Sequence, residues 1–188
     1  MENKTNSKRT NEAERKMMLR FRIGRWRFSL NVVHVTDVAG VNSILPDNRH
    51  ILMWDFDGVK PQQVIESLIE VQRKYKLPTI YVLYTGKKRH YMAYCFKRCE
   101  WQKAIEIIAA TKYVDMTFFR FGVWRKKFTL RITPKDGRKI RLFTKLVSPY
   151  PEDATIDELD SFVRYETISD VYEPKCKARE IRIGRCPT

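Results

Sequence analysis

Two aspartates at the end of an apolar run are the residues of this sequence best suited to chemistry. Asp55 and Asp57 close the run 50–57, and Gly58 follows them. Because side chains alternate between the two faces of a strand, residues two positions apart point to the same side. Two carboxylates held that close repel each other, and positive charge between them is needed to offset the repulsion. A pair of divalent metal ions usually provides that charge, and such sites catalyse phosphoryl and nucleotidyl transfer. The alternative is a solvated strand end whose carboxylates cap the next helix.

A basic turn leads to a histidine further along the chain. Lys87, Lys88 and Arg89 follow Gly86 and precede His90, which opens the next expected strand. Backbone amides of a glycine turn, lysine side chains and an imidazole together suit a triphosphate. The alternative is a surface turn with a structural histidine.

A third acid follows the second expected helix. Asp115 lies between that helix and the apolar residues 116–119. A single aspartate at such a place usually caps a helix or forms a turn. We therefore treat Asp115 as a candidate whose role depends on its distance from Asp55 and Asp57.

Positive charge is concentrated in the stretch 120–145. This stretch contains ten Lys and Arg residues and one acid, Asp136, with Phe121, Trp124 and Phe128 between them. Basic side chains contact phosphates, and aromatic rings stack on unpaired bases. The alternative is a set of core aromatics beneath a solvated charged face. The residues predicted to bind nucleic acid are Arg120, Trp124, Arg125, Lys126, Lys127, Lys135, Arg138 and Arg141.

The composition favours a polyanionic partner. The 188 residues carry a net charge of +15, and 43% are hydrophobic, which is enough for a folded core. Neither a membrane helix nor a signal core is expected, because no apolar stretch approaches the required length of about 20 residues. We expect an intracellular, cytoplasmic protein, in a host cell if a phage, virus or plasmid encodes it. Zinc is not expected, because the spacing of Cys95, Cys99, Cys176 and Cys186 matches no common zinc knuckle.

Hydrophobic periodicity predicts the elements that position these residues. A disordered basic arm is expected at 1–18, a single catalytic domain at 19–170 and a basic tail at 171–188. Phe21 and Ile23 alternate with Arg20 and Arg22, which predicts a strand or hairpin with an arginine-rich face. The segment 36–48 is expected to be a loop because it contains Gly40 and Pro46.

The middle of the chain predicts a strand–helix–strand unit followed by further strands. Pro61 suits the first residue of a helix, and a capping box at 155–158 predicts a short helix. Lys135, Asp136 and Gly137 suit a hairpin turn. The expected strands are 50–57, 79–84, 90–96, 127–134 and 138–145, the last two forming one hairpin, and the expected helices are 61–75 and 101–111.

The order of these parts resembles the archaeo-eukaryotic primase (primase-polymerase) superfamily, above all its small phage, virus and plasmid replication proteins. The resemblance covers roughly residues 50–145. The paired acids of the family fall on Asp55 and Asp57, and its small-x-His motif falls near Thr85–His90. Its third metal-binding acid falls on Asp115, and a basic strand residue near the nucleotide falls on Arg131. The chain departs from the strict histidine motif at Lys88, where a small residue is usual.

The resemblance implies an α+β fold, with a mixed or antiparallel sheet, flanking helices and a primase-like core similar to an RRM. It implies a DNA primase or nucleotidyltransferase that uses two Mg²⁺ or Mn²⁺ ions, held by Asp55, Asp57 and Asp115. The residues expected to contact the nucleoside triphosphate are Thr85, Lys87, Lys88, His90 and Arg131. The other expected partners are a single-stranded DNA or DNA/RNA template and, in trans, a helicase or another replication protein.

Two other interpretations remain open. The run Asp55-Phe56-Asp57-Gly58-Val59 also resembles the first motif of haloacid-dehalogenase-type phosphatases, with Asp55 as nucleophile and Asp57 as general acid. Thr85 resembles the second motif of that family, but no later Gly-Asp with a second acid supplies its metal site. The third interpretation is a non-catalytic replication initiator or single-strand-binding module.

Overall fold

The computed structural model describes residues 17–32 and 35–168, which form two compact units. Of these residues, 17–32, Val35 and Ile168 belong to one unit, and Thr36–Thr167 form the other. Apart from residues 17 and 18, which begin a strand, the arm expected at 1–18 lies outside the described residues, as does the whole tail expected at 171–188.

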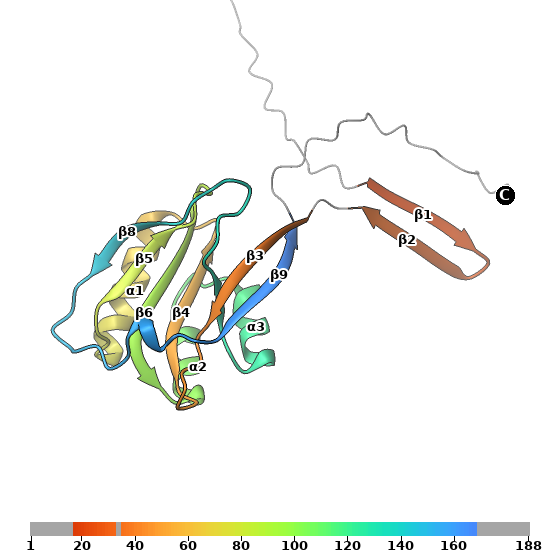
Figure 1. The fold of residues 1–188 in the computed structure, drawn as a ribbon. Helices are drawn as coiled ribbons and strands as arrows, with labels where there is room; N and C mark the ends of the chain where they lie inside the picture. Colours follow the sequence, from red (N-terminus) through yellow and green to blue (C-terminus); the bar gives the residue numbers. More distant parts are fainter. Residues whose placement is uncertain (1–16, 33–34, 169–188) are drawn as a thin grey trace, which may run out of the picture. The chain divides into compact units, whose positions relative to one another are not determined.

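Nine strands, three α-helices and one short 3₁₀ helix make up the described residues (Figure 1). None of these helices combines the length and the apolar character needed to cross a membrane. In chain order the elements are β1 (Met17–Ile23), β2 (Trp26–Val32), β3 (Val35–Asn42), β4 (His50–Asp57), α1 (Pro61–Tyr75), β5 (Ile80–Tyr84), β6 (His90–Cys99), α2 (Trp101–Ala109), α3 (Met116–Arg125), β7 (Thr129–Arg131), β8 (Arg141–Leu146), η1 (Ile156–Glu158) and β9 (Phe162–Ile168).

Strands β1 and β2 form an antiparallel hairpin, as the alternating sequence predicts. The turn contains Gly24 with φ of +56°, a conformation that glycine adopts readily. Phe21 lies opposite Phe28, and Arg22 lies opposite Arg27. The hairpin therefore separates aromatic from basic side chains onto its two faces.

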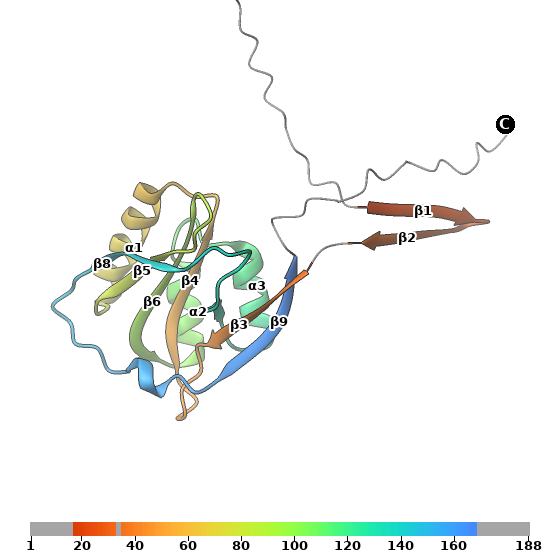
Figure 2. The same cartoon turned by 45° about the horizontal axis from the view of Figure 1, so that its top comes forward.

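The larger unit is built on a four-stranded sheet with the order β4-β6-β5-β8. Every neighbouring pair in it is antiparallel, so β4 and β5 run in the same direction with β6 between them. Helix α1 connects β4 to β5, and α1 and α2 lie on the same face of the sheet (Figures 1 and 2). The predicted mixed α+β class with an antiparallel sheet is confirmed.

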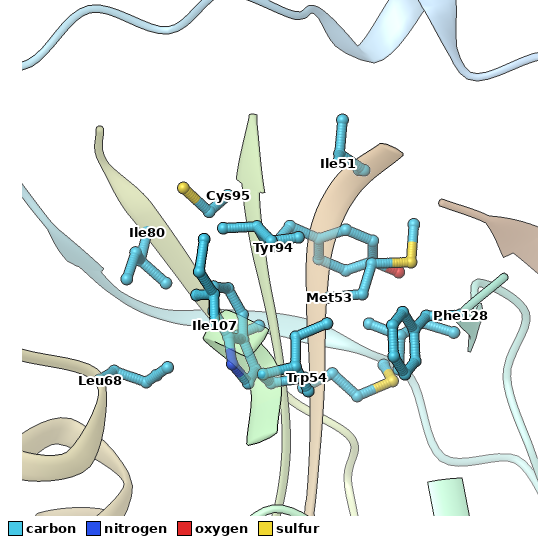
Figure 3. Close-up of a cluster of buried hydrophobic side chains, with 14 of the residues drawn as sticks. Ile51, Met53, Trp54, Leu68, Ile80, Tyr94, Cys95, Ile107 and Phe128 are labelled. Carbon is cyan, nitrogen blue, oxygen red and sulfur yellow. The ribbon is translucent and has the colours of Figure 1, made fainter. Parts of the chain in front are cut away.

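Side chains alternate between the two faces of β4, and both faces are buried up to Trp54. Trp54 is fully buried in the same hydrophobic cluster as Leu68 of α1 and Ile107 of α2 (Figure 3). Phe56 is fully buried in this cluster as well. The indole N–H of Trp54 donates to Thr111 Oγ1 at 2.9 Å, so the one polar group of this buried ring has a hydrogen-bond partner. Asp55 alternates with these two residues and therefore lies on the other face of the strand.

A second sheet, with the order β7-β3-β9, replaces the loop expected at 36–48. That prediction is wrong for residues up to Asn42, because Gly40 belongs to β3 and marks a close approach of strands, not a loop. A Cβ on Gly40 would lie 2.9 Å from Thr129 Cγ2 of β7. Ser43 links β3 to the core, since its hydroxyl contacts His50 Nδ1 at 2.9 Å and accepts from the Phe128 N–H at 3.1 Å.

The prediction that the strands at 127–134 and 138–145 pair with each other in a hairpin is wrong. The expected turn exists, because the N–H of Arg138 donates to the carbonyl of Lys135 at 2.9 Å. The strands on either side then diverge: β7 pairs with β3, and β8 pairs with β5. Pairing across different sheets depends on tertiary contacts that local turn chemistry does not specify.

The remaining boundaries agree closely with the periodicity. Strand β4 and helix α1 have the predicted bounds, while β6 extends three residues beyond the expected end at 96 and α2 ends two residues before 111. The capping box is confirmed, because the Thr155 N–H donates to Glu158 Oε2 at 2.7 Å. Helix α3 is an addition to the predicted elements.

Candidate active site at the end of strand β4

The predicted same-face geometry of the two aspartates holds in the sheet. Asp55 lies opposite Met92 and Asp57 lies opposite His90 in the β4–β6 ladder. Asp55 is partly buried, whereas Asp57 is exposed at the strand end. The pair therefore offers one carboxylate embedded in the protein and one facing solvent.

The imidazole of His90 is hydrogen-bonded to the carboxylate of Asp57. Its Nδ1 lies 2.5 Å from Asp57 Oδ1. The turn that precedes it is closed by its own backbone, because the N–H of Thr85 donates to the His90 carbonyl at 3.2 Å and the His90 N–H donates to the Lys87 carbonyl at 3.0 Å. The two ring nitrogens of a histidine lie on opposite sides, so contact through Nδ1 leaves Nε2 directed away from Asp57.

The basic turn packs against the segment between β7 and β8. Gly86 has φ of +84°, and a Cβ there would lie 2.7 Å from Arg138 Cβ. Arg138 in turn lies 3.1 Å from Asp136. Of the predicted phosphate contacts, Thr85 is buried and its hydroxyl donates to the His90 carbonyl at 3.2 Å, while Lys88 is exposed. Thr85 therefore shapes the turn, and Lys88 faces solvent.

Asp115 lies beside Asp55, although 60 positions separate them in the sequence. Its backbone N–H donates to the Asp55 carbonyl at 2.8 Å. Its carboxylate accepts from the N–H groups of Thr117 at 3.1 Å and Phe118 at 2.9 Å, which caps α3. The predicted third acid is therefore near the pair and at the same time a helix cap.

Crowding of negative charge changes the acidity of Asp55. Burial, followed by repulsion from Asp57 and Asp115, raises the pKa of Asp55 from its ordinary 3.8 to about 8. A hydrogen bond from the Phe56 backbone and attraction to Arg131 oppose this rise without cancelling it. A bound cation would relieve the same repulsion.

Arg131 and two tyrosines complete the surroundings of Asp55. Burial lowers the pKa of Arg131, while Tyr165 and Asp55 both favour its charged form. Burial and the charge of Asp55 raise the pKa of Tyr94. Burial and Asp55 also raise the pKa of Tyr165, although the positive charge of Arg131 opposes this rise. Neither tyrosine is among the site residues predicted from the sequence. The alternation of His90, Met92 and Tyr94 along one strand could have indicated Tyr94.

The carboxylates of Asp55, Asp57 and Asp115 are chemically suited to bind a hard divalent cation. Carboxylate oxygens are the ligands that Mg²⁺ and Mn²⁺ prefer. As the side chains stand, however, no three His, Cys, Asp or Glu residues within 17–32 and 35–168 are grouped to hold a metal ion. The carboxylate of Asp57 is turned toward His90 and that of Asp115 toward the first turn of α3, so binding a cation through all three acids requires these two carboxylates to rotate.

The predicted nucleic-acid contacts lie on α3, on β8 and in the connecting segments between them. Arg120, Trp124 and Arg125 lie exposed on α3, where the Arg125 guanidinium lies 5.4 Å from the centre of the Phe121 ring. Lys126 ends this helix with φ of +56°. Of the other predicted contacts, Lys127 follows the helix, Lys135 and Arg138 lie at the turn, and Arg141 begins β8.

Two features of the larger unit lie apart from the candidate site. Cys95 and Cys99 are buried thiols, and burial raises the pKa of Cys99 to about 11. Cys176 and Cys186 lie outside the described residues. A groove of about 510 Å³ between α1 and the segment after β8 is lined by Gln72, Arg73, Lys145 and Tyr150 among others, and by no predicted site residue.

Comparison with known proteins adds no family. No family model, curated protein or solved structure matches this chain.

Proposed function

We propose that the chain is a primase-polymerase-like nucleotidyltransferase that copies a single-stranded nucleic-acid template in replication. The observation that carries this proposal is that Asp57, Asp115, His90 and Arg131 gather around Asp55 at the end of β4. These residues come from β4, β6, β7 and the start of α3, so the grouping arises from the fold and not from sequence proximity.

The sheet arrangement is compatible with the RRM-like core that the family resemblance implies. Strands β4 and β5 flank β6 and are joined by α1, which is a split β-α-β arrangement. In this proposal, Asp55 and Asp57 form the first part of the cation site and Asp115 joins them from α3. When bound there, Mg²⁺ or Mn²⁺ would lower the pKa of a primer hydroxyl and neutralise the triphosphate.

The remaining residues would position the nucleotide. When His90 is protonated, both ring nitrogens are donors, so Nε2–H can donate to a phosphate oxygen while Nδ1 holds Asp57. Arg131 carries a charge close to Asp55 and can pair with a second phosphate oxygen. Lys88 extends from the turn next to His90 and adds a third positive charge.

The phosphatase interpretation is less well supported by the same geometry. It needs Asp55 ionised as a nucleophile and Asp57 protonated as a general acid. The pKa of Asp55 is raised to about 8, and Asp57 is exposed and bonded to His90. The raised pKa of Asp55 therefore disfavours the ionised nucleophile that the phosphatase interpretation requires.

The decisive test is template-directed incorporation of labelled nucleotides with Mn²⁺ or Mg²⁺. The wild-type chain should extend or start a strand, and Asp55→Ala with Asp57→Ala should abolish that activity. Asp160→Asn, at an exposed carboxylate, provides a matched control. Absence of incorporation with either metal would reject the enzymatic form of the proposal, and phosphate-ester hydrolysis lost in Asp55→Asn would support the phosphatase.

A second candidate function, a non-catalytic single-strand-binding module, is favoured by the surface of α3. Trp124 is 76% exposed and stands next to Arg125, an arrangement that suits stacking and phosphate contact together. If binding is the whole function, the Asp55→Ala, Asp57→Ala double variant should bind a single strand as well as wild type. Trp124→Ala should weaken that binding by roughly 5- to 100-fold.

A further inference from the structure

The hairpin β1–β2 has two chemically different faces. Phe21 and Phe28 are a cross-strand pair whose rings stack with centroids 5.0 Å apart, and Ile23 lies opposite Trp26 on the same face. Arg22 lies opposite Arg27 on the other face. All residues from 21 to 28 are exposed.

The aromatic face lacks the burial that would normally stabilise such a hairpin. Trp26 is 75% exposed and Ile23 is 63% exposed. A two-stranded hairpin is marginally stable by itself in water, because neither face is removed from solvent. These exposed apolar side chains therefore indicate a surface that a partner covers.

The basic face indicates the charge of that partner. Like charges directly opposite each other destabilise a strand pair, and Arg22 and Arg27 occupy such a position. Residues 17–32 contain four arginines and no acid, so the hairpin itself offers no carboxylate to offset them. Phosphate groups contacted by the two guanidinium groups would offset the repulsion.

We propose that this hairpin is a separate binding arm for single-stranded nucleic acid. Unpaired bases would stack on Trp26 and beside the Phe21–Phe28 pair, and Arg22, Arg25 and Arg27 would contact the phosphates. The ribbon is only two strands wide, about 4.8 Å between strand axes, so long arginine side chains can reach past its edge to a strand lying on the aromatic face.

A single strand can contact both the aromatic rings and the arginines of the hairpin, whereas a duplex or a second copy of the hairpin cannot. A duplex keeps its bases stacked on each other and would leave the aromatic face without a stacking partner. A second copy of the hairpin could cover the aromatic face but would bring more arginines together. The single strand alone satisfies the rings and the charges at once. This arm extends the proposed function without depending on catalysis.

The test measures anisotropy of the full chain with a labelled oligothymidine of about 20 nucleotides and with a duplex of equal length, at several salt concentrations. Trp26→Ala should weaken single-strand binding by roughly 5- to 100-fold and leave the salt dependence unchanged. Arg22→Gln with Arg27→Gln should weaken it and reduce the slope of log K against log salt by about 1.4, since each single-strand phosphate contact contributes about 0.7.

Matched variants distinguish binding by this hairpin from loss of the fold, from a general effect of charge and from loss of catalysis. Trp26→Phe keeps an aromatic ring and should retain binding, which distinguishes stacking from loss of the fold. Lys103→Gln with Lys112→Gln removes the same charge from exposed positions in the larger unit and should leave the slope within experimental error. The variant Asp55→Ala, Asp57→Ala should bind as wild type does, so failure of catalysis would not count against the arm.

Three results would overturn the proposal. The first is binding by Trp26→Ala and by the arginine variant within twofold of wild type. The second is stronger binding of the duplex that Trp26→Ala leaves unchanged. The third is a dimer in light scattering that Trp26→Ala converts to a monomer without changing single-strand binding, which would assign the aromatic face to a second copy.

Discussion

The backbone N–H of Asp115 donates to the carbonyl of Asp55 at 2.8 Å and thereby joins the start of helix α3 to the catalytic end of strand β4 in the proposed enzyme. The same residue caps α3 through its carboxylate. A structural and a chemical role therefore coincide at one side chain, and suitable substitutions can separate them.

Asp115→Asn should preserve the helix and remove the charge. Asparagine caps helices about as well as aspartate, whereas alanine at a cap costs about 1 kcal/mol. We therefore expect Asp115→Asn to unfold near the wild-type temperature and Asp115→Ala to unfold several degrees lower, as thermal denaturation would show. If Asp115 binds the catalytic cation, both variants should lose nucleotide incorporation. Full incorporation by Asp115→Asn would show that the residue serves only as a cap.

The stability of the metal-free protein should fall as pH rises from about 4 to about 8. The pKa of Asp55 is about 8 in the folded protein, against about 3.9 in an unfolded chain, so the folded state binds more protons within this interval. The free energy of unfolding therefore decreases with pH there, by an amount on the order of a few kcal/mol.

Urea denaturation in the presence of a chelator at several pH values measures this slope. Asp55→Asn removes the titrating group and should flatten the profile relative to Asp160→Asn, which carries the same substitution at an exposed site. An equally steep profile in Asp55→Asn would mean that another group controls the pH dependence.

Divalent cations should stabilise the folded protein through the paired aspartates. A ligand at 100 times its dissociation constant adds about 2.7 kcal/mol, which for a chain of this size raises the unfolding temperature by roughly 5–10 °C. Thermal denaturation with Mn²⁺ should show this rise in wild type and in Asp160→Asn. Asp55→Asn with Asp57→Asn should show none. A similar rise in that double variant would place the cation elsewhere.

Gly122→Ala should destabilise the protein even though alanine favours helices. A Cβ at this position would lie 2.3 Å from Cδ1 of Phe128, a ring that is fully buried. Overpacking of this kind costs about 1–3 kcal/mol, which exceeds the gain in helix propensity of about 1 kcal/mol. Val123→Ala, at an exposed position of the same helix, should change the free energy of unfolding by less than about 0.5 kcal/mol. Chemical denaturation of the two variants compares them directly.

The sequence predicted the elements in which local pattern and tertiary environment agree. Strand β4 is a continuous apolar run, and α1 has helical spacing with Pro61 at its first position, so their bounds were predicted correctly. The same-face geometry of Asp55 and Asp57 followed from alternation alone.

The errors occurred where distant contacts decide the structure. Helix α3 has little separation of apolar and polar faces, because Phe118 and Phe119 pack on Phe128 while Phe121 and Trp124 are exposed. Its most useful local signal was Asp115 as a cap. The strands on either side of the turn 135–138 find partners in different sheets, a choice that neither strand encodes by itself.

The contact between Gly122 and Phe128 also fixes a length. Because it holds α3 firmly on the core, the nine helical steps from Asp115 to Trp124 act as a rigid spacer of about 13 Å, at about 1.5 Å per step. Stacked nucleotides are spaced by about 3.4 Å, so this span corresponds to about four of them. In the proposed enzyme, a template base stacked on Trp124 would therefore lie at least about four nucleotide spacings from a nucleotide held beside Asp115, a separation set by the length of one helix.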